Sequence, residues 1–588
     1  MENPPAGQAA GSEDLAFQSG WDQGEEIFLF CARIEKVIAI QGSGFDVILV
    51  SGEPYADHPL SPVGVIARVL DAQGCRVGVI ESPDWKGKDD FLRLGRPRLF
   101  FGVTSGSIDS MLVNYTPLKR ERARDPNAPF TSRMPDRAVI VYANRLKELH
   151  RGVPIVLGGI EASLRRFAHY DYWEDTVRRS ILLDTRAEIL VYGPGEKQAV
   201  EIARRLDRGE ALDGIPGTCV VRAELPAEAK VIPSYEDVAR DKDKFCEAQR
   251  AFTNRRLLAQ GHANRYVIQY PAPEVRPEDL DWVYGLPFSR RIPAGFPELE
   301  MARFSVQTHR GCVGRCSFCA LSLHQGDRVV SRSEDSILEE IRSFAQHPDF
   351  KGYVDDLGGP TANMYGMDAA EAEAPREGRA EGEQPQGERG GEKPGRRTIV
   401  AAAHRRLLEL MRNARRLPGV KKVFVRSGIR YDLALGCPEY VRELAAHHVS
   451  GLLKVAPEHI SPRVLRLMNK SVGRDALEEF QRLYGAASGG RGQHLKYYFM
   501  VAHPGTTEKE ARELARYVRT LEGKGAKPVE GVQIFTPTPM TRSTCMYYTG
   551  KDPLTGEEVS VPRSFAEKKA QKRMLAASGP SRRRDEDD

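Results

Sequence analysis

Long apolar runs are missing from this chain of 588 residues, and so is a large excess of one charge. The apolar stretch 27–40 is interrupted by Arg33, Glu35 and Lys36 and is too short to cross a bilayer. Residues 1–26 are polar and acidic, without the basic start and apolar run of a signal peptide. The formal net charge is only +5, which by itself does not indicate a nucleic-acid binder and does not exclude one. Because no apolar segment is long enough to span a bilayer and no signal peptide is recognised, we expect no contact with a membrane.

The sequence also lacks a disulfide framework. Six of its nine cysteines stand alone, and the other three form one local cluster. The nine are Cys31, Cys75, Cys219, Cys246, Cys312, Cys316, Cys319, Cys437 and Cys545. Isolated cysteines with one cluster are typical of a reducing compartment, so we expect a cytoplasmic protein.

Strands and helices alternate after an N-terminal extension of residues 1–44. Over 45–206, short apolar runs that end in Gly or Ser are separated by helical segments, which predicts a doubly wound α/β domain with a parallel sheet. Its ligand edge is expected at the carboxyl ends of the strands. The predicted strands are 46–50, 76–80, 99–103, 154–157 and 189–192, with a helix over 63–72.

Two further regions follow. Residues 207–300 are expected to connect two domains, with a charged helix over 236–260 and a strand over 266–270. Over 301–563, about six strand-then-loop units alternate with helices, which predicts a complete or partial β/α barrel with its active site at the strand ends. Within it, 368–397 is rich in Glu, Gly, Arg and Pro and is expected to be disordered. Residues 564–588 form a charged tail that begins as a helix.

One loop carries the strongest chemical pattern, C-x3-C-x2-C at Cys312, Cys316 and Cys319. Three thiolates on one short loop can each bind a different iron of a cubane cluster, which leaves the fourth iron open to a ligand. Gly311 and Gly314 let the loop fold back over such a cluster. The alternatives are a structural zinc with His309 as fourth ligand, and an electron-transfer cluster completed by Cys437 or Cys545.

This loop resembles the signature of the radical S-adenosylmethionine (SAM) superfamily, C-x3-C-x-aromatic-C at the end of a first barrel strand. The resemblance implies a 4Fe-4S cluster that binds and reductively cleaves SAM, so that a radical abstracts hydrogen from a substrate that the sequence does not identify. It further implies an electron donor such as flavodoxin or ferredoxin. The residues expected around SAM are Phe318, Gly358, Gly359, Ser427 and Arg430. For the glycine pair a tight turn, and for Arg430 a structural ion pair, are the alternatives.

A longer match is to the YgiQ family of radical SAM proteins, whose substrate is uncharacterised. It rests on segments such as His309-Arg310-Gly311-Cys312, Asp356 to Tyr365, Arg430-Tyr431-Asp432 and Lys454 to His459. Glu458 and His459 end a strand and are candidates for acid–base or supporting roles. Family members often carry several cysteines after the Asn-Met-Tyr segment, where this chain has the insert 368–397. A second metal site there is therefore not expected.

The N-terminal domain resembles cobalamin-binding domains that precede radical SAM barrels. Cobalamin with an axial histidine needs D-x-H-x-x-G, and this chain has Asp57-His58-Pro59 instead. Cobalamin is therefore not favoured, although binding without an axial histidine stays open; otherwise the domain binds or shields substrate. The rival functions are a binding module stapled by an Fe–S cluster or zinc, and a radical SAM enzyme that modifies RNA.

Overall fold

The computed structural model describes residues 44–122, 134–292, 300–368, 396–470, 472–522 and 531–576. Nearly all of the extension 1–44 and of the insert 368–397 lies outside these residues, as does the end of the tail after residue 576. In the part of the chain that is described, no helix is both long and apolar enough to span a membrane.

The first half of the chain is built on one large sheet, and five of its strands are parallel. They lie in the order β2-β1-β3-β4-β7, with bounds β1 Val47–Ser51, β2 Val77–Glu81, β3 Phe100–Thr104, β4 Ile155–Leu157 and β7 Ile189–Val191. β1 is buried along its whole length, as expected for a strand that is covered on both faces. This confirms the doubly wound sheet.

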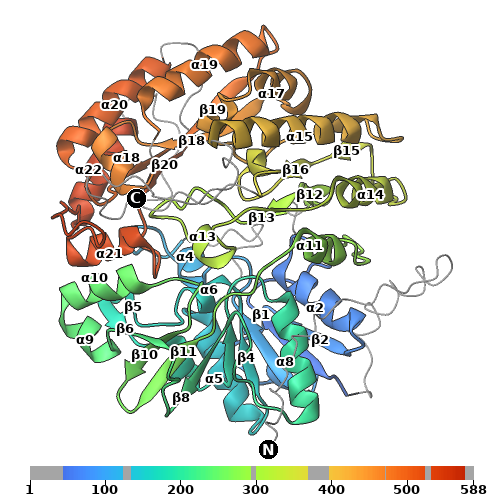
Figure 1. Cartoon of the computed structure of the whole chain (residues 1–588), viewed down its shortest axis with the longest axis vertical. Coiled ribbons are helices and arrows are strands. Elements are labelled where there is room, and N and C mark those ends of the chain that lie inside the picture. The colour runs from blue at the N-terminus through green and yellow to red at the C-terminus, as the bar shows by residue number, and fades with distance from the viewer. Residues whose placement is uncertain are drawn as a thin grey trace, which may run out of the picture. The chain divides into compact units, whose positions relative to one another are not determined.

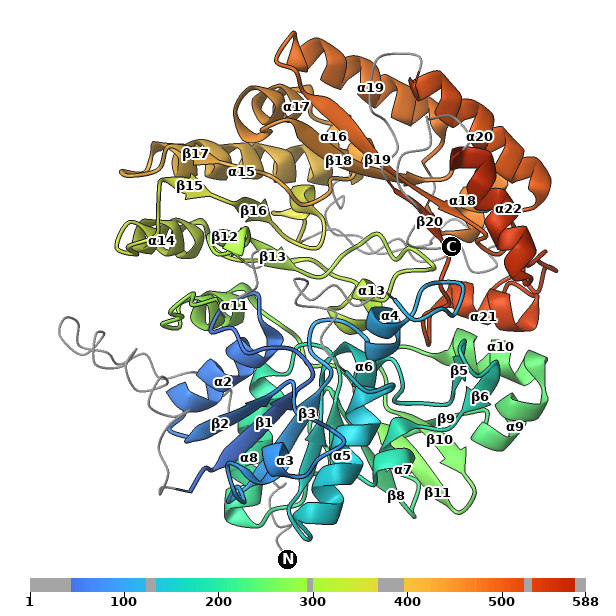
Figure 2. The ribbon, with the colours of Figure 1, turned by 180° about the vertical axis from the view of Figure 1, so that it is seen from behind.

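Helices cover both faces of this sheet. Figure 1 shows α2 (Pro62–Ala72) and α8 (Glu196–Arg208) on one face, and Figure 2 shows α3 (Asp89–Leu92), α5 (Ala138–Leu149) and α7 (Ile181–Thr185) on the other. α2 and α8 pack together over a core that includes Leu49, Leu70 and Ile202.

Residues 207–300 do more than connect two domains, because they extend the same sheet. β8 (Thr218–Arg222) pairs antiparallel with β7 and is followed in the sheet by β11 (Arg265–Gln269), β10 (Leu258–His262) and β9 (Lys230–Ile232). The prediction of a helix over 236–260 is wrong for the residues after 251. Helices α9 (Tyr235–Arg240) and α10 (Lys242–Ala251) stop before Leu258, because that segment is buried as a strand of the sheet.

The second half forms a partial barrel. Its strands are β12 (Ser305–Gln307), β15 (Tyr353–Val354), β16 (Asp356–Gly358), β17 (Lys422–Val423), β18 (Leu452–Glu458), β19 (His494–Val501) and β20 (Gly531–Ile534). Parallel ladders join β12 to β16, β15 to β17, and β18 through β19 to β20, and a parallel bridge links Ile429 to Val455. Since β15 and β16 follow one another as a single interrupted strand, the six predicted strand units are present. Among the described residues β12 and β20 do not pair, so the barrel is open there.

Helices cover the outside of these strands, and the last one belongs to the predicted tail (Figures 1 and 2). They include α14 (Glu334–Phe344), α15 (Arg396–Arg416), α19 (Arg474–Ser488), α20 (Glu508–Glu522) and α22 (Phe565–Ala576). Gln571 of α22 is buried, accepts a hydrogen bond from the Ala502 N–H (2.9 Å) and donates to the Thr506 carbonyl (3.2 Å). The start of the tail therefore packs against the end of β19 as part of the barrel's helical cover.

A buried ion-pair network ties the end of the sheet region to the barrel. Glu340 of α14 accepts hydrogen bonds from both Arg290 and Arg332, and all three side chains are almost fully buried. Two guanidinium groups around one carboxylate compensate its burial only while all three remain in place.

Candidate functional site

The cysteine loop leaves the end of β12 and is closed at its base. β13 (His309–Arg310) pairs antiparallel with β14 (Val330–Ser331), and the Cys312 N–H donates to the Gly326 carbonyl (3.2 Å). Gly311 has a φ of +79°, and a Cβ there would lie 1.8 Å from the Arg328 carbonyl oxygen. Only glycine fits at this position, as the sequence predicted.

The three cysteines lie close together, with the sulfur atoms of Cys312 and Cys316 beside Gly314. A Cβ at Gly314 would lie 3.4 Å from Cys312 Sγ and 3.8 Å from Cys316 Sγ. Within the described ranges, no three His, Cys, Asp or Glu side chains are grouped closely enough for one metal ion. Three thiols from one loop are the donor set that a cubane cluster takes when its fourth iron keeps an open position.

The three residues considered as an alternative fourth ligand have other neighbours. His309 is fully buried, with its ring against the Gly359 backbone and its Nδ1 2.8 Å from Thr308 Oγ1. Cys437 lies at the start of α17 (Pro438–Glu443), and Cys545 contacts Cys246.

Residues from two distant segments hold the loop in place. The Ser317 N–H donates to the Met468 carbonyl, the Asn469 side chain donates to the Arg315 carbonyl, and the Ser543 N–H donates to the Ser317 carbonyl, each at 2.9 Å. Sequence reasoning missed all three supports. Asn469 has a φ of +51°, a left-handed conformation that Asn adopts more readily than most residues. Nothing in the neighbouring sequence indicated this conformation.

Two buried cations lie near the loop. Burial raises the pKa of Cys316, while the positive charges of Lys470 and Arg430 oppose this rise. Burial also raises the pKa of Cys319, to about 12. Lys470, which the sequence did not single out, donates from Nζ to the Ala456 carbonyl and lies 3.4 Å from Glu458 Oε1. These cations stabilise negative charge on the thiols and on anything they bind.

The predicted glycine pair is required by close packing. A Cβ at Gly358 would lie 3.0 Å from Ser427 Oγ, and a Cβ at Gly359 would lie 2.5 Å from His309 Cε1. The Gly358 carbonyl accepts from the Thr308 N–H at 2.7 Å, so it is already engaged. The structure thus brings Gly358, Gly359 and Ser427 together at the ends of neighbouring strands.

Arg430 lies beside the cysteine loop and is fixed from two sides. Its Nη1 would be 3.0 Å from a Cβ at Gly314, and its guanidinium forms two hydrogen bonds, of 2.7 and 2.6 Å, with Asp432. Asn363 binds its backbone twice: Oδ1 accepts from the Arg430 N–H (2.8 Å) and Nδ2 donates to the Arg430 carbonyl (2.9 Å). The ion pair that the sequence raised as an alternative is present, and it orients the arginine at the site.

Phe318 occupies another part of the loop. Its ring packs edge-on against His503, with centroids 6.3 Å apart. The His503 Nδ1–H donates to the Pro504 carbonyl (2.7 Å), so Nε2 accepts from the Ser543 hydroxyl (2.7 Å). Burial lowers the pKa of His503 to about 3, and the imidazole is neutral at pH 7. His503 therefore supports Phe318 and α21 (Arg542–Thr549) rather than carrying a charge.

The two strand-end candidates after β18 differ in their surroundings. Glu458 has a φ of +65°, an uncommon conformation that often marks functional positions. His459 is buried, its Nδ1 accepts from the Ser461 N–H (3.0 Å), and burial lowers its pKa to about 4. Glu458 lies beside the buried cation Lys470, and His459 does not.

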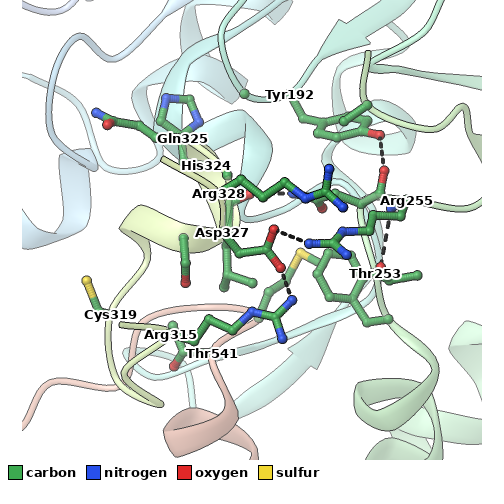
Figure 3. A pocket seen from close by; sticks show the side chains of 18 of the residues that line it. Tyr192, Thr253, Arg255, Arg315, Cys319, His324, Gln325, Asp327, Arg328 and Thr541 are labelled. Carbon is green, nitrogen blue, oxygen red and sulfur yellow. Dashed lines mark hydrogen bonds and ion pairs between the residues drawn. The ribbon is translucent and has the colours of Figure 1, made fainter. Parts of the chain in front are cut away.

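A cavity of about 1080 Å³ reaches the cysteine loop from the side of β7 and α10. Cys316 and Cys319 form part of its wall, whereas Gly358, Ser427 and Arg430 do not. Figure 3 shows the Asp327 carboxylate between Arg255 and Arg315. The wall carries more cations than carboxylates, which favours anionic groups on a ligand; the cations are Lys230, Arg250, Arg255, Arg256, Arg315, Arg328 and Arg542, and the carboxylates are Glu274, Asp327 and Asp368.

His58, the histidine considered as an axial ligand of cobalamin, is already engaged in hydrogen bonds. His58 is buried, its Nε2 donates to the Arg303 carbonyl (2.8 Å) and its Nδ1 accepts from the Leu60 N–H (3.1 Å). At the carboxyl edge of the sheet, Ser163 is hydrogen-bonded to His324 of α13 (Leu321–His324) at 3.0 Å. Part of the sheet edge therefore contacts α13, while His58, which is buried and already hydrogen-bonded, does not fit the role of an axial ligand of cobalamin.

Comparison with known proteins covers nearly the whole chain. Family models described as "Radical SAM N-terminal", "Radical SAM superfamily" and "Domain of unknown function (DUF3362)" match residues 31–305, 306–518 and 530–582. A UPF0313 protein of Geobacter sulfurreducens is 45% identical over 92% of this chain and 90% of its own length. A UPF0313 protein of Methanocaldococcus jannaschii is 44% identical over 90% of this chain and 88% of its own.

Among solved structures, the radical SAM methyltransferase TsrM of Kitasatospora setae, with tryptophan and a SAM analogue bound, matches with a TM-score of 0.47 and 19% identity over 84% of this chain and 75% of that chain. The family models match the radical SAM superfamily, and the UPF0313 relatives are similar over most of the chain. This chain therefore belongs to the UPF0313, or YgiQ, family of radical SAM enzymes, which use a 4Fe-4S cluster and SAM.

Proposed function

We propose that this enzyme binds its 4Fe-4S cluster through Cys312, Cys316 and Cys319 and uses it to cleave SAM reductively. The observation that supports this proposal most is the geometry of the loop, in which the sulfur atoms of Cys312 and Cys316 lie beside Gly314. The positive charges of Lys470 and Arg430 act on the Cys316 thiol from close by. When bound, such a cluster supplies the electron that breaks a C–S bond of SAM and starts hydrogen abstraction from substrate.

The residues of this chain contribute binding and orientation. Ser427 and Arg430 are held by Asp356 and Asp432 and present polar groups near the cysteine loop, where they would bind the ribose and carboxylate of SAM. Gly358 and Gly359 let the backbone approach closely, and Phe318 would face the adenine. The cavity beside Cys316 and Cys319 would admit the substrate or the electron donor, such as flavodoxin or ferredoxin.

Two features support the remaining parts of this proposal. All eight cysteines among the described residues are free thiols, which fits the reducing conditions of the cytoplasm. Radical SAM family membership disfavours a cluster or zinc that serves only as a structural staple.

Anaerobic cluster reconstitution tests the proposal. Wild-type protein should bind about four irons per chain and form 5'-deoxyadenosine when SAM and dithionite are added. Cys316→Ala should lose most of this iron and all SAM cleavage, whereas Cys219→Ala, a buried cysteine in β8, should keep both. Wild-type protein that stays free of iron and sulfide after reconstitution would refute the assignment.

A further inference from the structure

The second close group of cysteines in the described chain is a pair from opposite ends of the sequence. Cys246 lies on α10 and Cys545 on α21, with their sulfur atoms 3.8 Å apart. Figures 1 and 2 show these two helices side by side. Neither cysteine belongs to the cluster loop, and the proposed SAM chemistry uses neither.

The two thiols are chemically unlike each other. Cys545 is completely buried, whereas Cys246 is 6% exposed. The hydrogen bond from Cys545 lowers the pKa of Cys246 to about 7, and burial raises the pKa of Cys545 well above its ordinary value. A thiolate that receives a hydrogen bond from a second, protonated thiol is the arrangement of a nucleophilic and a resolving cysteine.

We propose that Cys246 and Cys545 form a redox-active dithiol that a hydroperoxide converts to an intramolecular disulfide. The Cys246 thiolate attacks one peroxide oxygen, the O–O bond breaks, and Cys246 becomes a sulfenic acid while the other oxygen leaves as water after protonation. Cys545 then attacks the Cys246 sulfur, an S–S bond forms, and the sulfenic oxygen leaves as a second water. In total, two thiols lose two electrons and two protons to one hydrogen peroxide, which yields one disulfide and two waters.

The disulfide would join two walls of the cavity beside the cluster loop. Gln249 of α10 already donates to the Met540 carbonyl just before α21 (3.2 Å), and both residues line that cavity. Since a disulfide holds its sulfurs about 2.05 Å apart, the gap of 3.8 Å must close through side-chain rotation, movement of the helices, or both. The Ser543 N–H of α21 supports Ser317, so any movement of α21 would change the support of the cysteine loop.

Peptide mass spectrometry tests the proposal on the anaerobically prepared holoenzyme. The protein is treated with hydrogen peroxide until the cluster absorbance begins to bleach, then unfolded in acid, alkylated and digested without reductant. We expect a linked Cys246–Cys545 peptide and a roughly ten-fold fall in alkylated Cys246, while Cys219, whose pKa burial raises to about 12, remains alkylated.

Two variants separate the chemical steps. Cys545→Ser should give no linked peptide and leave Cys246 as a sulfenic acid that dimedone captures, and Cys246→Ser should give neither product. Circular dichroism checks that both variants fold. The proposal is overturned if Cys246 and Cys545 of the wild-type protein both remain thiols at the bleaching dose, or if Cys246 is recovered linked to the cluster-loop cysteines instead.

Discussion

The double contact between Asn363 and the Arg430 backbone predicts a large effect of one amide side chain. Both hydrogen bonds are short, at 2.8 and 2.9 Å, and Asn363 is 1% exposed. Asn363→Ala leaves the Arg430 N–H without a partner, while the Arg430 carbonyl keeps its hydrogen bond from the Ala434 N–H (3.1 Å). At roughly 1–3 kcal/mol for one unsatisfied group, the local fold should lose roughly 1–3 kcal/mol.

Hydrogen-exchange mass spectrometry measures this loss where it occurs. Since 1.4 kcal/mol is about a factor of ten, a loss of about 2 kcal/mol would speed exchange of the Arg430 amide by roughly thirty-fold. SAM should bind more weakly at the same time, because the guanidinium would no longer be held beside the cysteine loop. Asn363→Asp is the matched control, since it keeps the acceptor for the Arg430 N–H and should retain more of the protection. Unchanged exchange and unchanged SAM affinity in Asn363→Ala would refute the reasoning.

Three further predictions concern packing, buried charge and pH. Gly359→Ala should lower the free energy of unfolding by about 1–3 kcal/mol, because its Cβ would lie 2.5 Å from a carbon of the His309 ring. Gly428→Ala, whose Cβ would have its nearest contact at 3.9 Å, should leave the melting temperature almost unchanged. Glu340→Ala leaves two buried arginines without their carboxylate and should lower the free energy of unfolding in urea by about 3–5 kcal/mol. Glu339→Ala, which removes an exposed ion pair, should lower it by less than about 0.5 kcal/mol. Equal effects of the two substitutions would contradict this account. Burial lowers the pKa of His262 to about 4. The neutral imidazole therefore contributes its full share of the folding stability above about pH 6.5, and this stability is lost as the pH falls toward 4. His262→Leu should therefore reduce the loss of stability between pH 7 and 5 by about 2 kcal/mol, as followed by tryptophan fluorescence.

The sequence predicted the parallel strands well because burial on both faces leaves an unmistakable apolar run, as in Val47–Ser51. It failed for β9 and β10, which lie at the end of the sheet and are more polar or partly exposed; Val231 in β9 is 52% exposed. β10 pairs with β11 and β9 pairs with β10, and no local sequence pattern encodes these pairings.

At the candidate site, too, some features could be predicted from the sequence and others could not. The cysteine spacing and the Gly358-Gly359 pair were visible because sulfur ligation and close packing need particular side chains. The supports of the loop were not visible, because the Met468 carbonyl and the Ser543 N–H are backbone groups that almost any residue would supply. Asn363 acts through its side chain, but its partner is 67 residues away and no spacing rule connects them.

The support of the cysteine loop by Ser543 has a consequence for how the enzyme matures. During synthesis the loop leaves the ribosome more than two hundred residues before the helix that steadies it. A nascent chain that has only just exposed its cysteines cannot yet hold them in the finished arrangement. We therefore expect stable cluster insertion only after α21 has been translated, and a chain truncated before α21 would offer the three cysteines without the contact that keeps their loop in position.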